Sequence, residues 1–353
     1  MEYFKGKKII LGIPQSFSLH EAFVKQLEFL GFQIIDISYI VDNFKYKNVK
    51  QRLYNSFRKV VFKDYEYKNI LKSRLAEEKI QETLSNIGKV DYALFIRPDF
   101  YTVDIIEKVK KLAHTTVGYQ WDGLERFPNA YSRIKLFERF FVFDPQDLRT
   151  SGTLPVTNFY FDYPLDTNDV EASDIFFLAT HIESRMDEIY YFFNTTASLS
   201  LKVNARIYTT KDEVIDSIHK ACPSLTGIKS TIPYDSNLKF AKHSNIILDF
   251  AHNIHNGLSL RVFEAIGYDK KLITTNKFVR DYDFYNPANI LVLDDRYTAE
   301  LIKEFIDMPY EPLDPRIKEK YSFTNWIKYV FDVEGHTPIL LPIEYLRKIN
   351  QHH

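Results

Sequence analysis

The chain has 353 residues and a net charge of −1; 45% of its residues are hydrophobic and 26% are charged. This composition is typical of a globular protein with two domains, and the near-zero net charge argues against a nucleic-acid binder. The single cysteine, Cys222, excludes a disulfide framework and a cysteine-based metal cluster, and it fits a reducing, cytoplasmic compartment.

The first residues predict the start of a doubly wound α/β domain. Residues 8–13 and 32–37 are predicted strands, and residues 19–30 form a predicted helix between them, which Gly31 ends. A strand-helix-strand opening of this kind is typical of a parallel sheet. The N-terminus lacks the pattern of a signal peptide, and no stretch is long and apolar enough for a transmembrane helix.

Residues 44–82 are helical in period and dense in cations and aromatic residues. The whole of residues 1–165 carries 25 Lys and Arg against 20 Asp and Glu. One interpretation is a surface that contacts an anionic membrane or a lipid-linked molecule. The other is a pair of solvated helices that use their aromatic residues as core.

Three more strands are predicted at 90–96, 115–120 and 140–143, and polar residues follow each of them. Asp99 comes shortly after the first strand and Trp121-Asp122 after the second. His20 follows the loop after the opening strand. Since the carboxyl ends of parallel strands form one edge of a sheet, these side chains are expected to face a cleft.

Pro155, Pro164 and the polar run 166–174 indicate a domain boundary. We therefore predict an N-terminal domain over 1–165, a second domain over 166–320 and a closing segment over 321–353. The second domain has predicted strands at 174–178, 201–207, 246–248, 272–275 and 289–293, and predicted helices at 211–220 and 234–241. Thr180 lies in its first strand-to-helix loop and Arg185 in the first turn of the helix that follows.

Residues 246–276 carry the strongest signal in the chain. They predict a buried strand, a polar loop ending at Gly257, a helix with Ser259 at its N-cap position, and another strand. A helix that opens after a parallel strand offers free backbone N–H groups and a dipole that favour a phosphate. Arg261, in the first turn, adds a forked cation.

The order Gly257-Leu258-Ser259-x-Arg261-x-Phe263-Glu264-Ala265, followed by residues 270–276, resembles the donor-nucleotide site of GT-B glycosyltransferases. The nearest likeness is to bacterial enzymes that build capsule, lipopolysaccharide and exopolysaccharide. In these enzymes a strand ending in Trp-Asp is followed by a helix and then by Phe-Val-Phe-Asp, the last strand of the first domain. Trp121-Asp122 and residues 141–144 are similar to these two features. The resemblance implies an α/β, GT-B architecture, in which two Rossmann-like doubly wound domains flank a cleft and a C-terminal helix crosses back.

The resemblance also implies how a donor would be held. Glu264 would bind the nucleotide ribose and Arg261 the diphosphate, with Ser259, Leu258 and Gly257 completing the loop. Thr180 and Arg185 would face the diphosphate from the first strand-to-helix loop of the same domain, and no metal or cofactor is implied. The plainer interpretation is a core helix with an incidental surface Arg and Glu, and a solvated helix arginine at 185.

One departure from the family bears on the reaction. Many retaining members carry a second Glu eight positions before Glu264, where this chain has Asn256. An inverting transfer needs a base that takes the proton of the acceptor hydroxyl, and Asp122, His20 and Asp99 are the candidates. Beside Asp122, Trp121 would raise the proton affinity of the carboxylate and stack on a sugar. Alternatively, Asp122 caps the next helix, and in a retaining transfer, which needs no such base, Asp122 would only position the acceptor.

Together these features predict a nucleotide-sugar-dependent glycosyltransferase, a hexosyltransferase by preference. Its acceptor would be a lipid-linked or growing surface polysaccharide, and it would lie at the inner face of a membrane, with an anionic membrane surface as partner and no nucleic acid. The alternatives are an inactive GT-B-shaped binding protein and a sugar-nucleotide epimerase on the same fold.

Overall fold

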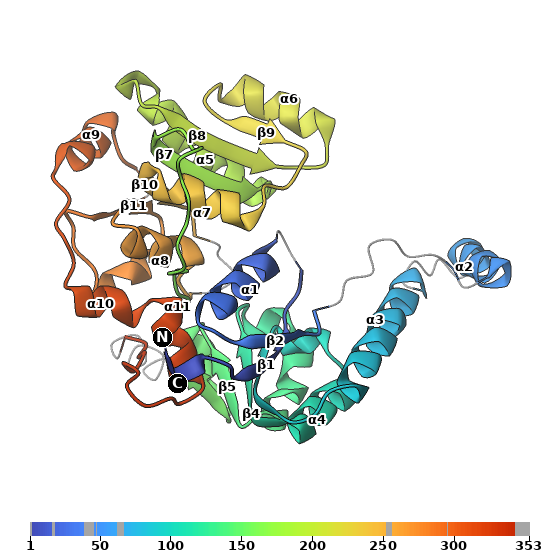
Figure 1. The fold of residues 1–353 in the computed structure, drawn as a ribbon. Helices are drawn as coiled ribbons and strands as arrows, with labels where there is room; N and C mark the ends of the chain where they lie inside the picture. The colour runs from blue at the N-terminus through green and yellow to red at the C-terminus, as the bar shows by residue number, and fades with distance from the viewer. Residues whose placement is uncertain are drawn as a thin grey trace.

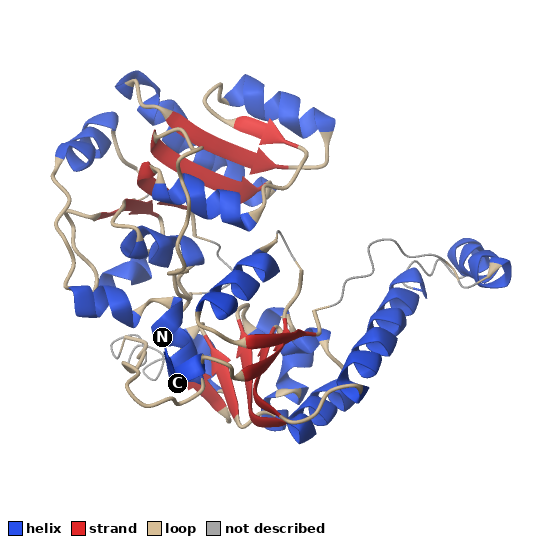
Figure 2. Ribbon diagram, viewed as in Figure 1, coloured by secondary structure: helices blue, strands red, loops and turns tan. Residues whose placement is uncertain are grey.

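The computed structural model describes residues 2–15, 18–38, 46, 48–61, 67–251, 256–294 and 296–342. Within this part of the chain the strands form two parallel six-stranded sheets, one from each half of the sequence. Helices cover both faces of each sheet (Figure 2). The two Rossmann-like, doubly wound domains expected from the sequence are therefore present.

The first sheet is built from the N-terminal half. Its strand order is β2-β1-β3-β4-β5-β6, so the order reverses between β1 and β3. Ligands of open α/β sheets bind at such a reversal, beyond the carboxyl ends of the strands. The strands are β1 (Lys8–Gly12), β2 (Gln33–Asp36), β3 (Val90–Ile96), β4 (Ala113–Gln120), β5 (Arg139–Val142) and β6 (Thr153–Pro155).

The second sheet has the order β12-β11-β10-β7-β8-β9, with its reversal between β7 and β10. Strand β7, predicted after the polar boundary, and strand β10, predicted in the motif around Gly257, are therefore neighbours. They pair in parallel, with Ser173 opposite Ser244. The strands are β7 (Ser173–Thr180), β8 (Val203–Tyr208), β9 (Thr226–Ile228), β10 (Ser244–Asp249), β11 (Lys271–Thr274) and β12 (Ile290–Val292).

The helices follow the strands in chain order. Those of the first half are α1 (Leu19–Phe29), α2 (Val49–Val61), α3 (Tyr67–Ser85) and α4 (Val103–Leu112). Those of the second half are α5 (Glu183–Thr196), α6 (Asp212–Ala221), α7 (Tyr234–Lys242), α8 (Leu260–Gly267), α9 (Ala299–Asp307), α10 (Pro315–Lys320) and α11 (Phe323–Val330).

The structure corrects the prediction for the end of the first sheet. Residues 141–144 were expected to close this sheet, but β6 adds an edge strand beyond β5. Between β4 and β5 the expected helix is replaced by three 3₁₀ turns, Leu124–Arg126, Pro128–Ser132 and Ile134–Leu136. Pro128 starts the second turn and removes a backbone donor that a continuous helix would need.

The C-terminal segment returns to the first sheet (Figure 1). Trp326 of α11 is fully buried, and its indole N–H donates to the carbonyl of Thr157 at 3.1 Å. The Tyr329 hydroxyl donates to the Pro155 carbonyl at 3.0 Å. Phe23 of α1, Phe159 and Phe323 form a cluster of rings 4.9–5.7 Å apart, so one apolar core joins both halves.

Helices α2 and α3 form an arm that extends from the first sheet, with α2 at its far end (Figure 1). They account for most of the predicted helical segment 44–82, although residues 44, 45, 47 and 62–66 lie outside the described part. None of the described helices combines the length and the apolar character needed to cross a bilayer.

Candidate functional site

A cavity of about 300 Å³ lies at the reversal point of the second sheet. Its walls are the carboxyl ends of β7 and β10 and the beginning of α8, so three segments distant in sequence meet there. This is where a doubly wound sheet binds its ligand. Its polar lining residues are Thr180, Arg185, Asp249, Ser259, Arg261 and Asn276, and Gly257 also lines it. Five of these lining residues, Thr180, Arg185, Gly257, Ser259 and Arg261, are ones that the sequence assigns to a donor.

Arg185 is the most informative of these residues. One terminal nitrogen donates to the carbonyl of Phe250, while its buried Nε has no hydrogen-bond partner among the described residues. Burial lowers the pKa of the guanidinium, and the nearby Asp249 opposes that shift. A buried donor without an acceptor costs free energy, which an anion in the cavity would recover.

Arg261 lies on the first turn of α8, over the ring of Phe176. Its Nη1 donates to Glu264 Oε2 at 2.5 Å and its Nη2 donates to Asn237 Oδ1 at 2.8 Å. Burial alone would lower the pKa of Arg261, but the Glu264 carboxylate raises it above its ordinary value. The guanidinium is therefore a fixed, permanently charged part of the cavity wall.

Glu264 is 1% exposed and is held from both sides. Its Oε1 accepts from the Tyr234 hydroxyl at 2.7 Å, while its other oxygen faces Arg261. Burial and the Glu264 charge together raise the pKa of Tyr234 far above its usual range. Among the described residues that line the cavity Glu264 is absent, so its carboxylate orients Arg261 and Tyr234, and its contact with a ribose stays a prediction.

A second cavity of about 190 Å³ opens beside the first. The two share Thr180 and Arg261, and the second continues between the ends of β8 and β9 and the start of α7. Its walls are mainly apolar and aromatic, from Tyr208, Ile228, Ile232 and Tyr234. A flat apolar group and an adjoining anion would therefore fit the pair of cavities, with Arg261 between them.

The loop before α8 contacts the first sheet. A Cβ on Gly257 would lie 2.3 Å from the Phe143 ring and 2.9 Å from the Phe143 carbonyl oxygen, which no side chain tolerates. The Leu258 carbonyl accepts from the Asn158 side chain at 2.9 Å, and the Asn256 N–H donates to Asp144 at 3.2 Å. Glycine therefore allows the cavity wall to pack directly on the neighbouring domain.

Two loop residues have contacts that the sequence did not suggest. Ser259 occupies the N-cap position, but its hydroxyl donates to the buried Asp249 carboxylate at 2.7 Å and caps no helix N–H. Asp249 also accepts from Thr274 at 2.9 Å, because a buried carboxylate needs donors. Leu258 is 2% exposed, belongs to the core between the domains and is absent from the described residues that line the cavity, so its contact with a ligand stays a prediction.

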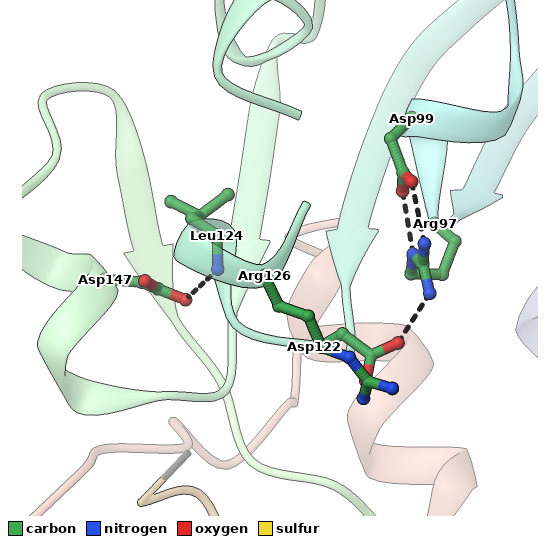
Figure 3. A network of polar contacts seen from close by, with 6 residues as sticks. All are labelled: Arg97, Asp99, Asp122, Leu124, Arg126 and Asp147. Carbon is green, nitrogen blue, oxygen red and sulfur yellow. Dashed lines mark hydrogen bonds and ion pairs between the residues drawn. The ribbon is translucent and has the colours of Figure 1, made fainter. Parts of the chain in front are cut away.

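At the edge of the first sheet, Arg97 lies between two carboxylates (Figure 3). Nε and Nη2 donate to the two oxygens of Asp99 at 2.8 and 2.7 Å, and Nη1 donates to Asp122 at 2.5 Å. The guanidinium stacks 3.6 Å above the ring of Phe127. Arg97 adopts a left-handed backbone, φ 56°, that turns the chain after β3.

These contacts occupy the carboxylates of two predicted bases, Asp122 and Asp99. Asp122 accepts from Arg97 through one oxygen and from Arg126 through the other, at 3.2 Å. Its partners are thus two cations, where the sequence suggested an apolar wall from Trp121. It caps no helix either, since Gly123 occupies that position. Asp99 has a side chain 8% exposed and is held by both of its oxygens, so neither carboxylate is presented as a free base.

His20 has a different environment. It lies in the first turn of α1, after β1, and its Nε2 is 2.8 Å from Asp36 Oδ2 at the end of β2. Burial would raise the pKa of Asp36, but hydrogen bonds from His20 and Ser38 lower it. The carboxylate therefore fixes the imidazole ring and leaves Nδ1 as its remaining nitrogen. Asp36 was not among the site residues predicted from the sequence, although it lies at the end of a strand, the feature by which Asp99 was chosen.

Other features of the described residues add little. No group of three or more His, Cys, Asp and Glu side chains there is arranged to hold a metal ion. Both reversal points do carry charged groups, however. His20 and Arg97 follow the strands β1 and β3. At the second reversal point Arg185 follows β7, whose last residue is Thr180, and Arg261 follows β10.

Comparison with known proteins identifies the fold. No protein-family model matches the chain, and no curated protein matches its sequence significantly. Among solved structures it is similar to AviGT4, a glycosyltransferase involved in avilamycin A biosynthesis, at 10% identity and a TM-score of 0.52, over 98% of this chain and 97% of that one. It is also similar to a UDP-forming α,α-trehalose-phosphate synthase from Burkholderia xenovorans, at 10% identity and a TM-score of 0.51, over 98% and 100%. The chain therefore has the GT-B fold.

Proposed function

We propose that the protein is a nucleotide-sugar-dependent glycosyltransferase. The observation that carries this proposal is the cavity at the reversal point of the second sheet. Arg185 and Arg261 face it, and Arg185 Nε lacks an acceptor among the described residues. Two guanidinium groups in a partly buried site suit a diphosphate, and the adjoining apolar cavity suits a base.

The donor would lie across Arg261. The diphosphate would accept hydrogen bonds from Arg185 and from the loop ending in Ser259, where the N-terminus of α8 adds its partial positive charge. The nucleobase would enter the second cavity, between Tyr208 and Tyr234. A ribose between them would approach Glu264 only by sharing its oxygens with Arg261 and Tyr234.

The transfer step needs a general base on the side of the cleft formed by the first domain. We choose His20, because Asp36 holds its ring and leaves Nδ1 to accept a proton. Its Nδ1 would take the proton of the acceptor hydroxyl as that oxygen forms a bond to the anomeric carbon. The bond from the anomeric carbon to the diphosphate breaks, and the nucleotide leaves with the electron pair. Arg185 and Arg261 would stabilise the charge that develops on it. This step inverts the anomeric centre.

The acceptor would approach from the first domain. Trp121 is half-buried at the end of β4, and Phe100 is 63% exposed beside Arg97. Both offer aromatic faces to a sugar, which supports a saccharide acceptor. We extend the proposal to a hexose donor and to a lipid-linked or growing surface polysaccharide at the cytoplasmic face of a membrane.

Titration calorimetry tests the donor site. Wild-type protein should bind a nucleoside diphosphate more tightly than the corresponding nucleoside, across UDP, GDP and dTDP. Loss of a charge-assisted hydrogen bond weakens binding about 10- to 100-fold, so Arg185→Ala should lose that advantage. Arg316→Ala, at a fully exposed arginine that pairs with Asp314, is the matched control. Equal affinity of wild type and Arg185→Ala for every diphosphate would refute the site.

A further inference from the structure

Helix α1, which carries His20 in its first turn, packs against α7 of the second domain (Figure 1). An ion pair joins the two helices, in which Lys25 Nζ donates to Asp235 Oδ1 at 2.8 Å. The two residues are 210 positions apart in the chain, so this contact links the two domains. Because Lys25 and His20 belong to one helix, a contact that fixes Lys25 also fixes the backbone that carries the predicted base.

Asp235 is held by two donors, which distinguishes this contact from an ordinary surface ion pair. Its Oδ1 also accepts from the Tyr163 hydroxyl at 3.1 Å. Burial and the Asp235 charge raise the pKa of Tyr163 far above its ordinary value, so the phenol remains a donor. Burial would raise the pKa of Asp235, but the hydrogen bonds from Lys25 and Tyr163 lower it. An exposed ion pair alone contributes little to stability, whereas a pair within a network of contacts can fix a geometry.

Gln26, the residue after Lys25, attaches α1 to the segment between the domains. Its side chain is fully buried, and its Oε1 accepts from the backbone N–H groups of Asp162 at 2.9 Å and Tyr163 at 3.0 Å. Two consecutive residues of α1 therefore bind α7 and that segment. The helix cannot shift against the second domain without breaking these contacts.

The other side of this contact is the donor site. Tyr234, which precedes Asp235 in the first turn of α7, lines the second cavity and donates to Glu264. Glu264 in turn accepts from Arg261, which lies between the two cavities. A nucleobase in the second cavity would therefore lie against the same turn of α7 that Lys25 binds.

We propose that Lys25, through its ion pair with Asp235, is a positioning residue that sets His20 against the donor. The inference rests on the proposed function, because it takes a nucleotide in the second cavity and His20 as the base. Reaction between groups on two domains needs their atoms within a narrow range of distance, and a displacement of about 1 Å can cost about 10²-fold in rate. The ion pair fixes the distance between the helix that carries the base and the helix that borders the nucleobase.

Kinetics of donor hydrolysis test the inference, measured on the full-length protein with UDP-, GDP-, dTDP- and CMP-linked sugars. Lys25→Met should lower kcat about 10- to 100-fold and leave the donor KM unchanged, because the donor keeps all of its own contacts. Lys25→Arg should restore the rate, since it keeps the ion pair. The double variant Lys25→Met/Asp235→Asn should lose no more than Lys25→Met, because the two residues act as one pair.

Lys7→Met is the matched control. Lys7 pairs with Asp91 at 2.9 Å, at the amino-terminal edge of the first sheet and away from the carboxyl ends of its strands. The side chains of that pair are 44% and 30% exposed, and those of the proposed pair are 47% and 25% exposed. The control should lose as much stability in urea as Lys25→Met and keep the wild-type kcat. An equal fall of kcat in the control would make the effect one of stability and would overturn the inference.

A His20→Ala background shows whether Lys25 acts through His20. There Lys25→Met should lower kcat no further. An equal loss in both backgrounds, or wild-type kcat in Lys25→Met, would overturn the inference. Calorimetric titration with UDP, GDP and dTDP separates this from failure of the proposed function. Wild-type protein that binds none of them would refute the donor site and this inference with it, whereas wild-type turnover that Lys25→Met retains would refute the inference alone.

Discussion

Arg261 and Glu264, one turn apart on α8, form an ion pair with 2.5 Å between Nη1 and Oε2, and the carboxylate is 1% exposed. The pairing gives the two residues different tasks. The cation remains on the wall of the cavity, while the carboxylate holds it there from beneath. A ligand that meets Arg261 therefore meets a side chain whose position is already fixed, and ordering it costs little on binding.

Replacing Glu264 by Ala should weaken nucleotide binding about 10- to 100-fold, because Arg261 loses its main partner. It should also lower the free energy of unfolding by about 3–5 kcal/mol, since Arg261 is left buried without its counter-charge. Titration calorimetry and urea unfolding measure the two effects. Glu264→Gln keeps an acceptor for Tyr234 and should lose less stability. A folded Glu264→Ala protein with wild-type nucleotide affinity would contradict this role.

Gly257→Ala tests the contact between the donor loop and the first domain. The new methyl group would meet the ring and the carbonyl of Phe143, so the loop must move. We expect a loss of about 1–3 kcal/mol of stability and a weaker nucleotide affinity. Gly88→Ala is the matched control, because a Cβ there meets nothing within 4 Å. If both variants behave like wild type in thermal unfolding and in nucleotide titration, the loop does not depend on this contact.

His20→Ala should reduce donor turnover by about 10²-fold or more with donor affinity intact, as expected for a lost general base. Donor hydrolysis reports this, since water takes the place of the acceptor. Asp36→Asn should reduce donor turnover less than His20→Ala does, because the His20 ring keeps a hydrogen-bond partner. Asp122→Asn should keep its turnover but unfold at a lower temperature, since it loses its charge between Arg97 and Arg126. The reverse pattern would make Asp122 the base.

Asp147 should make stability depend on pH. Burial raises the pKa of its carboxyl from 3.8 to about 7, Asp144 and Glu125 add to the shift, and the Leu124 N–H opposes it. A raised carboxyl pKa favours the protonated form in the folded state, so stability should fall as pH rises from about 4 to about 7. Asp147→Asn should flatten that slope in urea unfolding at several pH values. An unchanged slope would show that Asp147 titrates normally.

Local patterns in the sequence predicted most of the fold. Strand β3 has the predicted bounds, and the strand, loop and helix around Gly257 have the predicted order. Strand β6 was missed because three residues ending in Pro155 resemble a linker, although proline is tolerated on an edge strand. The 3₁₀ turns after Trp121 were missed because the family resemblance implied a helix there, although Pro128 already marks a break in a continuous helix.

The candidate site was predictable in its place but less so in its contacts. Strand ends at a reversal point brought Arg185 and Arg261 to one cavity, as the resemblance to GT-B glycosyltransferases implied. Pairings across the structure needed the strand order, which sequence spacing does not give. The His20–Asp36 contact depends on β2 lying beside β1, and the Arg97–Asp122 contact on β4 lying beside β3.

The most direct test of the central claim is turnover of a panel of UDP-, GDP-, dTDP- and CMP-linked sugars by the purified protein without acceptor. Mass spectrometry of the products separates the outcomes. Our account predicts slow release of free sugar and free nucleotide from one class of donor, and its loss in Arg185→Ala. Interconversion of epimeric nucleotide sugars would identify an epimerase instead, and binding without turnover of any donor would leave a binding protein; either result would contradict a glycosyltransferase.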